Sequence, residues 1–405
     1  MEAIKDIIVL ALLVYMFKKR ILIGHIFMSC AILFGLLHAL TPFKLVELVY
    51  ITITTPSNVS IYIALYLITF LERIMRKTGA QAKLVEGLVK VSGNPRVSMA
   101  ALPAIIGLLP SPGGARFSAP LVERAAQNIG ATPEDNAAIN YYYRHLWEYF
   151  LPLYPATLVA AEVLRVPLAK FILLMLPYTA ITILAGITLF RKVNPLPQEE
   201  ETVGKTDALK AWKALLEGLT PIVAITLLVL LSGMNIALAL TLVLVIMLIY
   251  YRIAPKDIGV MLIDALELRL LYMLMSALFM REVLVATGST VQLLAWCQSL
   301  GLSPLLITII FPMLMGLLTG VTLAGVTMAM PVVVTLAGPD NLLALGTLAF
   351  ASIVIGIMLS PTHLCLIMSI EHFSADFGKS WVKLVLPYLL IMAFALAYYY
   401  ILSVV

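Results

Sequence analysis

Arg144, His145 and Glu148 stand together in an apolar segment of the first half of the chain, and His363 stands in an apolar segment of the second half. A charged side chain in apolar surroundings is costly unless it is paired or functional. A guanidinium binds a carboxylate through two parallel hydrogen bonds, and a His or Glu carries a proton. These residues therefore indicate anion binding or proton transfer. An ion pair between Arg144 and Glu148, with His363 as a packing residue, explains the same pattern without chemistry, and both interpretations stay open.

Pro and Gly residues interrupt the apolar segments at four points, and hydroxyl residues stand beside them. One pair of interruptions is residues 110–114 and 319–322, and the other begins at Tyr154-Pro155 and Ser360-Pro361. Because Pro lacks the amide donor and Gly lacks side-chain restraint, a regular helix does not continue through these points. Freed amides and helix N-termini attract an anion, whereas freed carbonyls and hydroxyls suit a small hard cation such as Na⁺.

The candidate site residues are the polar and glycine residues of these interruptions and the charges near them. For the substrate they are Ser111, Gly113, Gly114, Arg116, Arg144, Thr157, Thr319, Thr322, Thr362 and His363. For the coupling ion they are Ser111, Thr157, Thr322 and Thr362 if the ion is Na⁺, or His145, Glu148 and His363 if it is H⁺. Hydroxyls recur at all four interruptions, whereas His363 has no counterpart in the first half, so Na⁺ is favoured. Arg116 has a structural alternative, which is pairing with Glu123 on the same arm.

The composition shows what kind of elements must position these residues. Hydrophobic residues make up 62% of the chain and charged residues only 12%, and the mean hydropathy is +1.02. A soluble domain carries about 25% charged residues, so this chain is expected to lie in lipid. The net charge of +5 does not indicate nucleic acid, because the bases are spread between apolar segments. Cys30, Cys297 and Cys365 show neither a disulfide framework nor a metal-ligand spacing.

Ten apolar segments reach the length of about 18 residues that a membrane-crossing helix needs. They are residues 3–19, 21–40, 52–76, 136–163, 167–190, 212–232, 234–251, 261–287, 341–370 and 381–404. Two interruptions fall inside the spans 136–163 and 341–370. The other two fall in the shorter stretches 97–130 and 305–336, whose arms have the length of re-entrant hairpins. The sequence therefore predicts an all-α polytopic membrane protein in which two hairpins and two interrupted helices position the site.

The two halves of the chain repeat one another. Seven residues recur at a spacing of 209: Phe70, Thr78, Gly79, Pro103, Gly107, Leu108 and Leu109 return as Phe279, Thr287, Gly288, Pro312, Gly316, Leu317 and Leu318. This spacing defines repeat 1 as residues 1–190, a polar linker as 191–211 and repeat 2 as 212–405. Five crossings in each repeat are an odd number, so the second repeat is expected to enter the membrane from the opposite side, as in inverted-repeat transporters.

Lys and Arg residues predict the orientation. Eighteen of them flank the spans on the side taken as cytoplasmic, and four lie on the other side: Lys5, Lys44, Arg165 and Lys170. Positive residues are enriched in cytoplasmic loops, so both termini are expected outside. The first apolar segment lacks a small-residue cleavage site and is expected to be a retained helix.

Paired hairpins with polar tips and paired interrupted helices in two inverted five-helix repeats resemble the ion transporter superfamily, which includes divalent-anion/sodium symporters and gluconate permeases. Within it, the Pro-Ser-Pro-Gly-Gly run at 110–114 and the Arg-His-Leu-Trp-Glu-Tyr run at 144–149 look like a poorly characterised family of prokaryotic integral membrane proteins. The tips carry no Ser-Asn-Thr motif of the sodium–dicarboxylate branch. The resemblance implies a homodimer in a prokaryotic cytoplasmic membrane, in which the hairpins and interrupted helices move against a scaffold.

The expected function is secondary active transport, as a Na⁺- or H⁺-coupled symporter of a small organic anion such as a carboxylate. A channel or uniporter for small anions is the alternative, and intramembrane hydrolysis by Ser111 with His145 or His363 is a distant one. The chain has no phosphate-binding Gly-Lys-Ser/Thr loop, no His-Glu-x-x-His and no nucleophile elbow, so no enzyme is expected. The expected partners are the anionic substrate, membrane lipid and a second copy of the chain. No cofactor is expected other than Na⁺.

Overall fold

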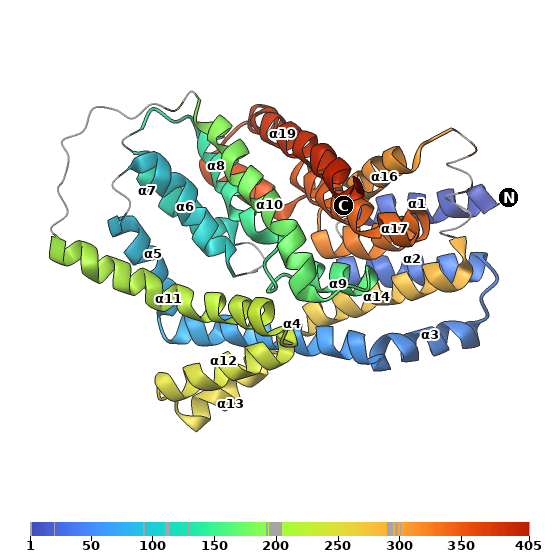
Figure 1. Cartoon of the computed structure of the whole chain (residues 1–405), viewed down its shortest axis with the longest axis horizontal. Coiled ribbons are helices and arrows are strands. Elements are labelled where there is room, and N and C mark those ends of the chain that lie inside the picture. Colours follow the sequence, from blue (N-terminus) through green and yellow to red (C-terminus); the bar gives the residue numbers. More distant parts are fainter. Residues whose placement is uncertain are drawn as a thin grey trace.

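The computed structural model describes residues 2–19, 21–91, 94–109, 114–127, 129–191, 193, 205–289, 295, 299 and 301–404. Every element within these residues is a helix (Figure 1). Six helices in the described part are long and apolar enough to cross a membrane: Pro56–Lys77, Leu168–Phe190, Leu209–Ser232, Leu268–Thr287, Asn341–Met358 and Phe377–Val404. The described part of the chain is therefore all-helical, and its long apolar helices are those of a membrane protein.

The first half contains ten α-helices and two short 3₁₀ helices among its described residues. They are α1 (Glu2–Lys18), α2 (Ile23–Leu37), α3 (Pro42–Thr54), α4 (Pro56–Lys77), α5 (Ala80–Val91), α6 (Pro95–Gly107), α7 (Ala115–Ala126), α8 (Pro133–Arg144), η1 (Leu146–Tyr149), α9 (Pro155–Val163), α10 (Leu168–Gly186) and η2 (Ile187–Phe190). Several begin with Pro, whose fixed φ suits the first helical position. Thr132 and Asp135 form a capping box at the start of α8, which fixes where that helix begins.

The second half repeats this order of elements. Its described helices are α11 (Lys205–Ser232), α12 (Ile236–Tyr250), α13 (Pro255–Asp264), α14 (Leu268–Thr287), α16 (Pro304–Thr319), α17 (Thr322–Met358), α18 (Leu364–Phe373) and α19 (Phe377–Val404). Gly338, with φ 61° and ψ 176°, divides α17 into two helical parts. Along the chain, α4 corresponds to α14, α6 to α16, α7 and α8 to the two parts of α17, α9 to α18, and α10 to α19.

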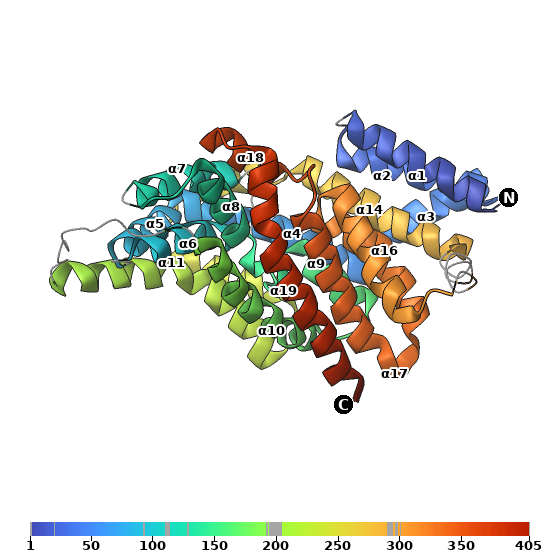
Figure 2. The ribbon, with the colours of Figure 1, turned by 90° about the horizontal axis from the view of Figure 1, so that it is seen from above.

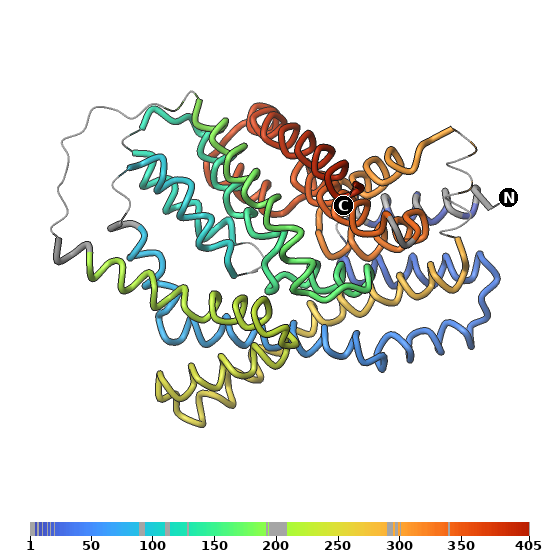
Figure 3. Tube along the Cα trace, in the orientation of Figure 1, coloured from blue at the N-terminus to red at the C-terminus, as the bar shows by residue number. Residues whose placement is uncertain are grey.

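Helices of one half pack on helices of the other half, and each such pair has a counterpart in which the two halves are reversed. Helix α2 packs on α14 and α12 packs on α4, while α3 contacts α14 and α13 contacts α4. In the same way α8 packs on α18 and α9 packs on α17. Figure 2 shows α8 and α18 side by side, and Figure 3 shows α2 running beside α14, although these elements come from opposite halves of the chain. The two halves are therefore interleaved instead of forming two separate bundles.

Four of the ten expected spans contain no described helix of the length that a membrane crossing needs. The expected spans 3–19, 21–40 and 234–251 correspond to α1, α2 and α12, which have 17, 15 and 15 residues. The span 136–163 is shared by α8, η1 and α9. The short helices α3 and α13 were not expected. Each follows a left-handed turn, at Ala39 with φ 65° and at Arg252 with φ 49°, that ends the preceding helix.

The predicted hairpins are helix pairs. The arms of the first are α6 and α7, and the arms of the second are α16 and the first part of α17, and each pair packs together along its length. The second lies within about two residues of its expected range 305–336, whereas the first ends at Ala126, four residues before the end of its expected range 97–130. Helix α11 begins at Lys205, inside the expected linker 191–211. Residues 194–204 lie outside the described residues.

Candidate functional site

Two irregular segments, one from each half, lie where helices end and restart. We name residues 145–154 break 1 and residues 359–363 break 2. Break 2 falls where the sequence predicts it, at Ser360-Pro361. Break 1 was expected at Tyr154-Pro155, but α8 already ends at Arg144. The segment between Arg144 and Pro155 contains the 3₁₀ helix η1, so the first interruption is longer than predicted.

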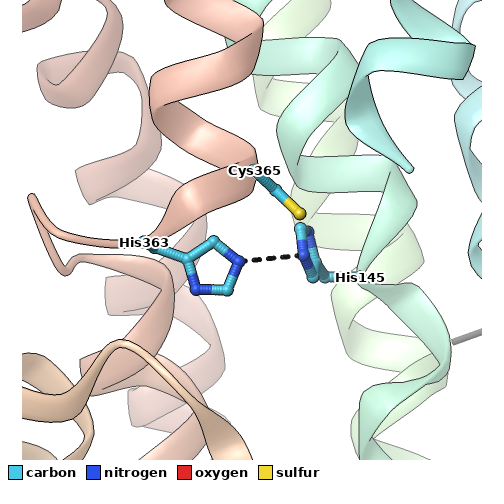
Figure 4. Close-up of side chains that lie close together, drawn as sticks. All are labelled: His145, His363 and Cys365. Carbon is cyan, nitrogen blue, oxygen red and sulfur yellow. Dashed lines mark hydrogen bonds between the residues drawn. The ribbon is translucent and has the colours of Figure 1, made fainter. Parts of the chain in front are cut away.

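His145 of break 1 and His363 of break 2 contact one another directly. Their Nε2 atoms are 3.2 Å apart, and both side chains are buried (Figure 4). His145 Nδ1 lies 2.6 Å from the Tyr141 carbonyl oxygen, and His363 Nδ1 lies 2.8 Å from the Gly320 carbonyl oxygen. The two breaks therefore meet inside the protein, and each ring is oriented by a carbonyl of its own half.

Glu148 provides a second connection between the halves. Its Oε2 atom accepts a 2.5 Å hydrogen bond from the Thr322 hydroxyl, which stands at the start of α17. Its Oε1 atom lies 3.9 Å from His145 Nε2. Glu148 is buried, so the hydroxyl and the imidazole partly replace the water that a carboxylate would otherwise need. The expected helical i,i+4 relationship between Arg144 and Glu148 is absent, because the α-helix ends at Arg144.

Arg144 packs against the tip of the first hairpin, where α7 begins. A Cβ atom placed on Gly114 would overlap the Arg144 guanidinium, so this positive group packs directly against the residue where α7 begins. Arg144 is also buried. A buried guanidinium beside the N-terminus of a helix produces a positive potential, which favours an anion at this end of the hairpin.

Each hairpin is attached to the break of its own half. The Tyr154 hydroxyl donates a 2.6 Å hydrogen bond to the Gly107 carbonyl, and the Ser360 hydroxyl donates one of the same length to the Leu317 carbonyl. Gly107 also approaches the Arg144 carbonyl so closely that a Cβ would overlap it, and Gly316 approaches the Ile353 carbonyl in the same way. These two close approaches are separated by the same 209 residues as the sequence repeat.

Hydroxyl and carbonyl oxygens gather at both breaks. The Thr157 hydroxyl lies 2.7 Å from the Tyr154 carbonyl oxygen and 3.1 Å from that of Leu151. At break 2 the hydroxyls of Ser360 and Thr362 are 2.9 Å apart. Such oxygens are the donors that a hard cation prefers. The Thr319 hydroxyl bonds within α16, to the Met315 carbonyl at 2.8 Å.

The predicted site residues divide into three groups. The structure brings together His145, Glu148, Thr322 and His363, it packs Arg144 against Gly114, and it places Thr157 and Thr319 in the buried segments that adjoin them. Arg116 is exposed on α7, and Thr362 is exposed at break 2. Ser111 and Gly113 lie outside the described residues.

Sequence reasoning did not connect Cys365 with the two histidines. Its Sγ atom and a ring nitrogen of each histidine all lie within 4.8 Å of one another, and all three residues are buried (Figure 4). His145 and His363 are 218 residues apart in the chain, so no local spacing marks this cluster. Tyr141 is also buried, and its ring packs edge-on against His145 and contacts His363.

Comparison with known families assigns the chain to one of them. The family described as "Protein of unknown function (DUF401)" matches residues 4–402, so the chain belongs to this family. A search of the curated proteins finds no match.

Proposed function

We propose that this protein is a secondary active transporter that carries a small organic anion together with Na⁺. The single observation that carries the proposal is the meeting of the two breaks, joined by the Glu148–Thr322 hydrogen bond and the His145–His363 contact. Irregular backbone at membrane depth is tolerated where it is buried in protein or lines a water-filled cavity, and transporters use such segments to bind substrate and ion. The breaks are accordingly the proposed substrate and ion sites.

The repeated order of helices supports this assignment. Helices of one half pack on corresponding helices of the other, as expected for two repeats related by a pseudo-two-fold axis. We further propose that the repeats have inverted topology and that the two hairpins are re-entrant. This architecture is that of the ion transporter superfamily, and it supplies a moving unit made of the hairpins and the interrupted helices.

Charge supports an anion as the substrate. Arg144 is buried against Gly114, and the helices α7, α9, α17 and α18 each begin at a hairpin tip or at the end of a break. Helix N-termini carry partial positive charge, so a carboxylate near them is stabilised. The Arg144 guanidinium could bind both oxygens of such a group.

The oxygen atoms at the breaks support Na⁺ as the coupling ion. Thr157 with two carbonyls in the first half, and Ser360 with Thr362 in the second half, give each half its own set of oxygen donors. Coupling to H⁺ through His145, Glu148 and His363 is the other outcome that the experiment distinguishes.

A ligand screen tests the proposal. Purified protein in detergent is heated with carboxylates, amino acids and inorganic anions, with and without Na⁺, because a ligand that binds only the folded state raises its thermal midpoint. We expect a carboxylate to raise the midpoint, and to raise it more when Na⁺ is present. An anion effect on the midpoint that is independent of Na⁺ but varies with pH would indicate that the coupling ion is H⁺ and not Na⁺. Absence of any anion effect across the screen would contradict the proposal.

A further inference from the structure

The hydrogen bonds of His145 and His363 determine where their protons are. A carbonyl oxygen only accepts, so each Nδ1 atom, at 2.6 Å from Tyr141 O and 2.8 Å from Gly320 O, must carry the hydrogen. In the neutral form both Nε2 atoms then present lone pairs, and these atoms face one another at 3.2 Å. Two lone pairs at this distance repel unless a positively charged species lies between them.

Cys365 completes a set of metal donors around this point. Its side chain extends from the first turn of α18 toward the two rings (Figure 4), and the three donor atoms lie within 4.8 Å of one another. Imidazole nitrogen and thiolate sulfur are the ligands that Zn²⁺ and related thiophilic ions prefer. In metal sites, a histidine typically donates its other N–H to a carbonyl or carboxylate, as both rings do here.

The spacing of the two nitrogens fits a tetrahedral ion. An ion about 2.0–2.1 Å from each nitrogen separates them by roughly 3.3 Å at a tetrahedral angle. The observed separation is 3.2 Å. Glu148 lies beside the fourth position, with Oε1 at 3.9 Å from His145 Nε2 and its other oxygen held by Thr322. A small movement of Oε1 would complete the coordination shell.

The charges also balance. Two neutral imidazoles, one thiolate and one carboxylate contribute a charge of −2, which a divalent ion neutralises. A neutral assembly is far cheaper to bury in a membrane protein than an isolated carboxylate or thiolate. On binding, the Cys365 thiol would lose its proton to solvent as the sulfur–metal bond forms.

We propose that His145, His363 and Cys365, with Glu148 as fourth donor, form a buried site for a thiophilic divalent cation of the Zn²⁺ class that joins the two halves. The site does not depend on the transport proposal, because its ligands and its test concern metal binding alone. Its ligands come from break 1, break 2 and the start of α18, so a bound ion would hold the two interrupted helices together.

Metal binding by the purified full-length chain tests the site. The protein is stripped with a chelator and titrated with Zn²⁺ against a competing indicator, and Co²⁺ is used as a coloured probe. We expect one ion per chain, and Co²⁺ should give the intense visible bands of tetrahedral coordination and a thiolate charge-transfer band. Cys365→Ala and His363→Gln should each weaken Zn²⁺ binding at least about 100-fold, since loss of even an outer-shell partner costs 10–100-fold.

Two control variants make the same residue changes, Cys to Ala and His to Gln, at positions outside the cluster. Cys30→Ala alters another buried cysteine, and His372→Gln alters a histidine that pairs with Glu123 at 3.1 Å instead of facing the cluster. Both should bind Zn²⁺ as the wild type does. X-ray absorption of the Zn²⁺-loaded wild type, which needs no variant, should show one sulfur among the ligands. Absence of tight binding, a shell without sulfur, or full binding by Cys365→Ala overturns the proposal.

Discussion

Glu148 of break 1 accepts a 2.5 Å hydrogen bond from Thr322 at the start of α17, although 174 residues separate the two in the chain. Neither partner is at the protein surface, because both side chains are buried. A hydrogen bond to a charged group is worth about 1.5–3 kcal/mol, and leaving the buried carboxylate without this donor costs a similar amount. The contact therefore makes the packing of one half depend on the other.

This dependence predicts the outcome of a double-mutant cycle. Thr322→Val keeps the shape of the side chain and removes the donor, so it should lower the free energy of unfolding by about 1.5–3 kcal/mol. Glu148→Gln combined with Thr322→Val should cost less than the sum of the two single changes, because the pair acts together. The measurement is reversible unfolding in mixed micelles. Thr327→Val is the control, since its hydroxyl bonds only to the Leu323 and Ala324 carbonyls of its own helix. Additive effects of the two site changes would show that the contact is not energetically coupled.

Gly114 gives a prediction about substrate binding. Its φ of −58° is open to any residue, so backbone strain does not require glycine here, but a Cβ would overlap the Arg144 guanidinium. Because a guanidinium at the end of a flexible side chain can move, Gly114→Val should leave folded yield nearly intact. It should displace the positive charge and abolish uptake or lower substrate affinity at least about 10-fold, the equivalent of 1.4 kcal/mol. Uptake and thermal midpoints of the variant check both statements.

Gly259→Ala is the control for that experiment, since no atom lies within 4 Å of the added Cβ. The control should bind and transport as the wild type does. Normal transport by Gly114→Val would remove the first hairpin tip from the site.

Alanine substitutions at Gly107 and Gly316 are expected to lower the stability of the fold. The added Cβ of an alanine would overlap a backbone carbonyl in each case, that of Arg144 or of Ile353, and a helix backbone cannot move as a side chain can. Gly107→Ala and Gly316→Ala should each destabilise the fold by about 1–3 kcal/mol, the usual cost of overpacking. The thermal midpoints of these two variants, compared with that of the control Gly259→Ala, measure the destabilisation. A midpoint equal to that of the control for either variant would contradict the close packing of its hairpin.

How far the sequence predicts the structure depends on how local each signal is. The sequence shows Gly107 and Gly316 at equivalent positions of the repeat, and the structure shows that a Cβ at either position would overlap a backbone carbonyl. Break 2 was located correctly, since Pro361 lacks the amide that a helix needs. The signals in both cases are residue types at a fixed position.

Break 1 could not be located from such signals. No Pro or Gly stands between Arg144 and Leu151, yet the α-helix ends at Arg144. Trp147 Nε1 donates to the Ala104 carbonyl at 2.6 Å, and the Tyr154 hydroxyl donates to the Gly107 carbonyl, so side chains of break 1 bond to α6. These are tertiary contacts. The His145–His363–Cys365 cluster escaped prediction for the same reason, because its members come from separate halves.

The proposed inverted topology predicts the side on which two residues are labelled. Single cysteines introduced at Lys77, at the end of α4, and at Gly204, which lies outside the described residues, should both react with an impermeant maleimide only from the cytoplasmic side. A cysteine at Arg165, in the turn after α9, should react only from outside. Labelling of Lys77 and Gly204 from opposite sides would contradict the orientation derived from the Lys and Arg residues.

Uptake by proteoliposomes tests the transport proposal most directly. The protein is reconstituted, the anion found in the ligand screen is supplied outside at the same concentration as inside, and an inward Na⁺ gradient is imposed. We expect the internal anion concentration to rise above the external one and to fall back when an ionophore dissipates the gradient. Gly259→Ala should behave in the same way and Gly114→Val should not accumulate the anion. Accumulation driven by a pH gradient without Na⁺ would identify H⁺ as the coupling ion. Equilibration that never exceeds the external concentration under either gradient would contradict active transport and indicate a channel or uniporter.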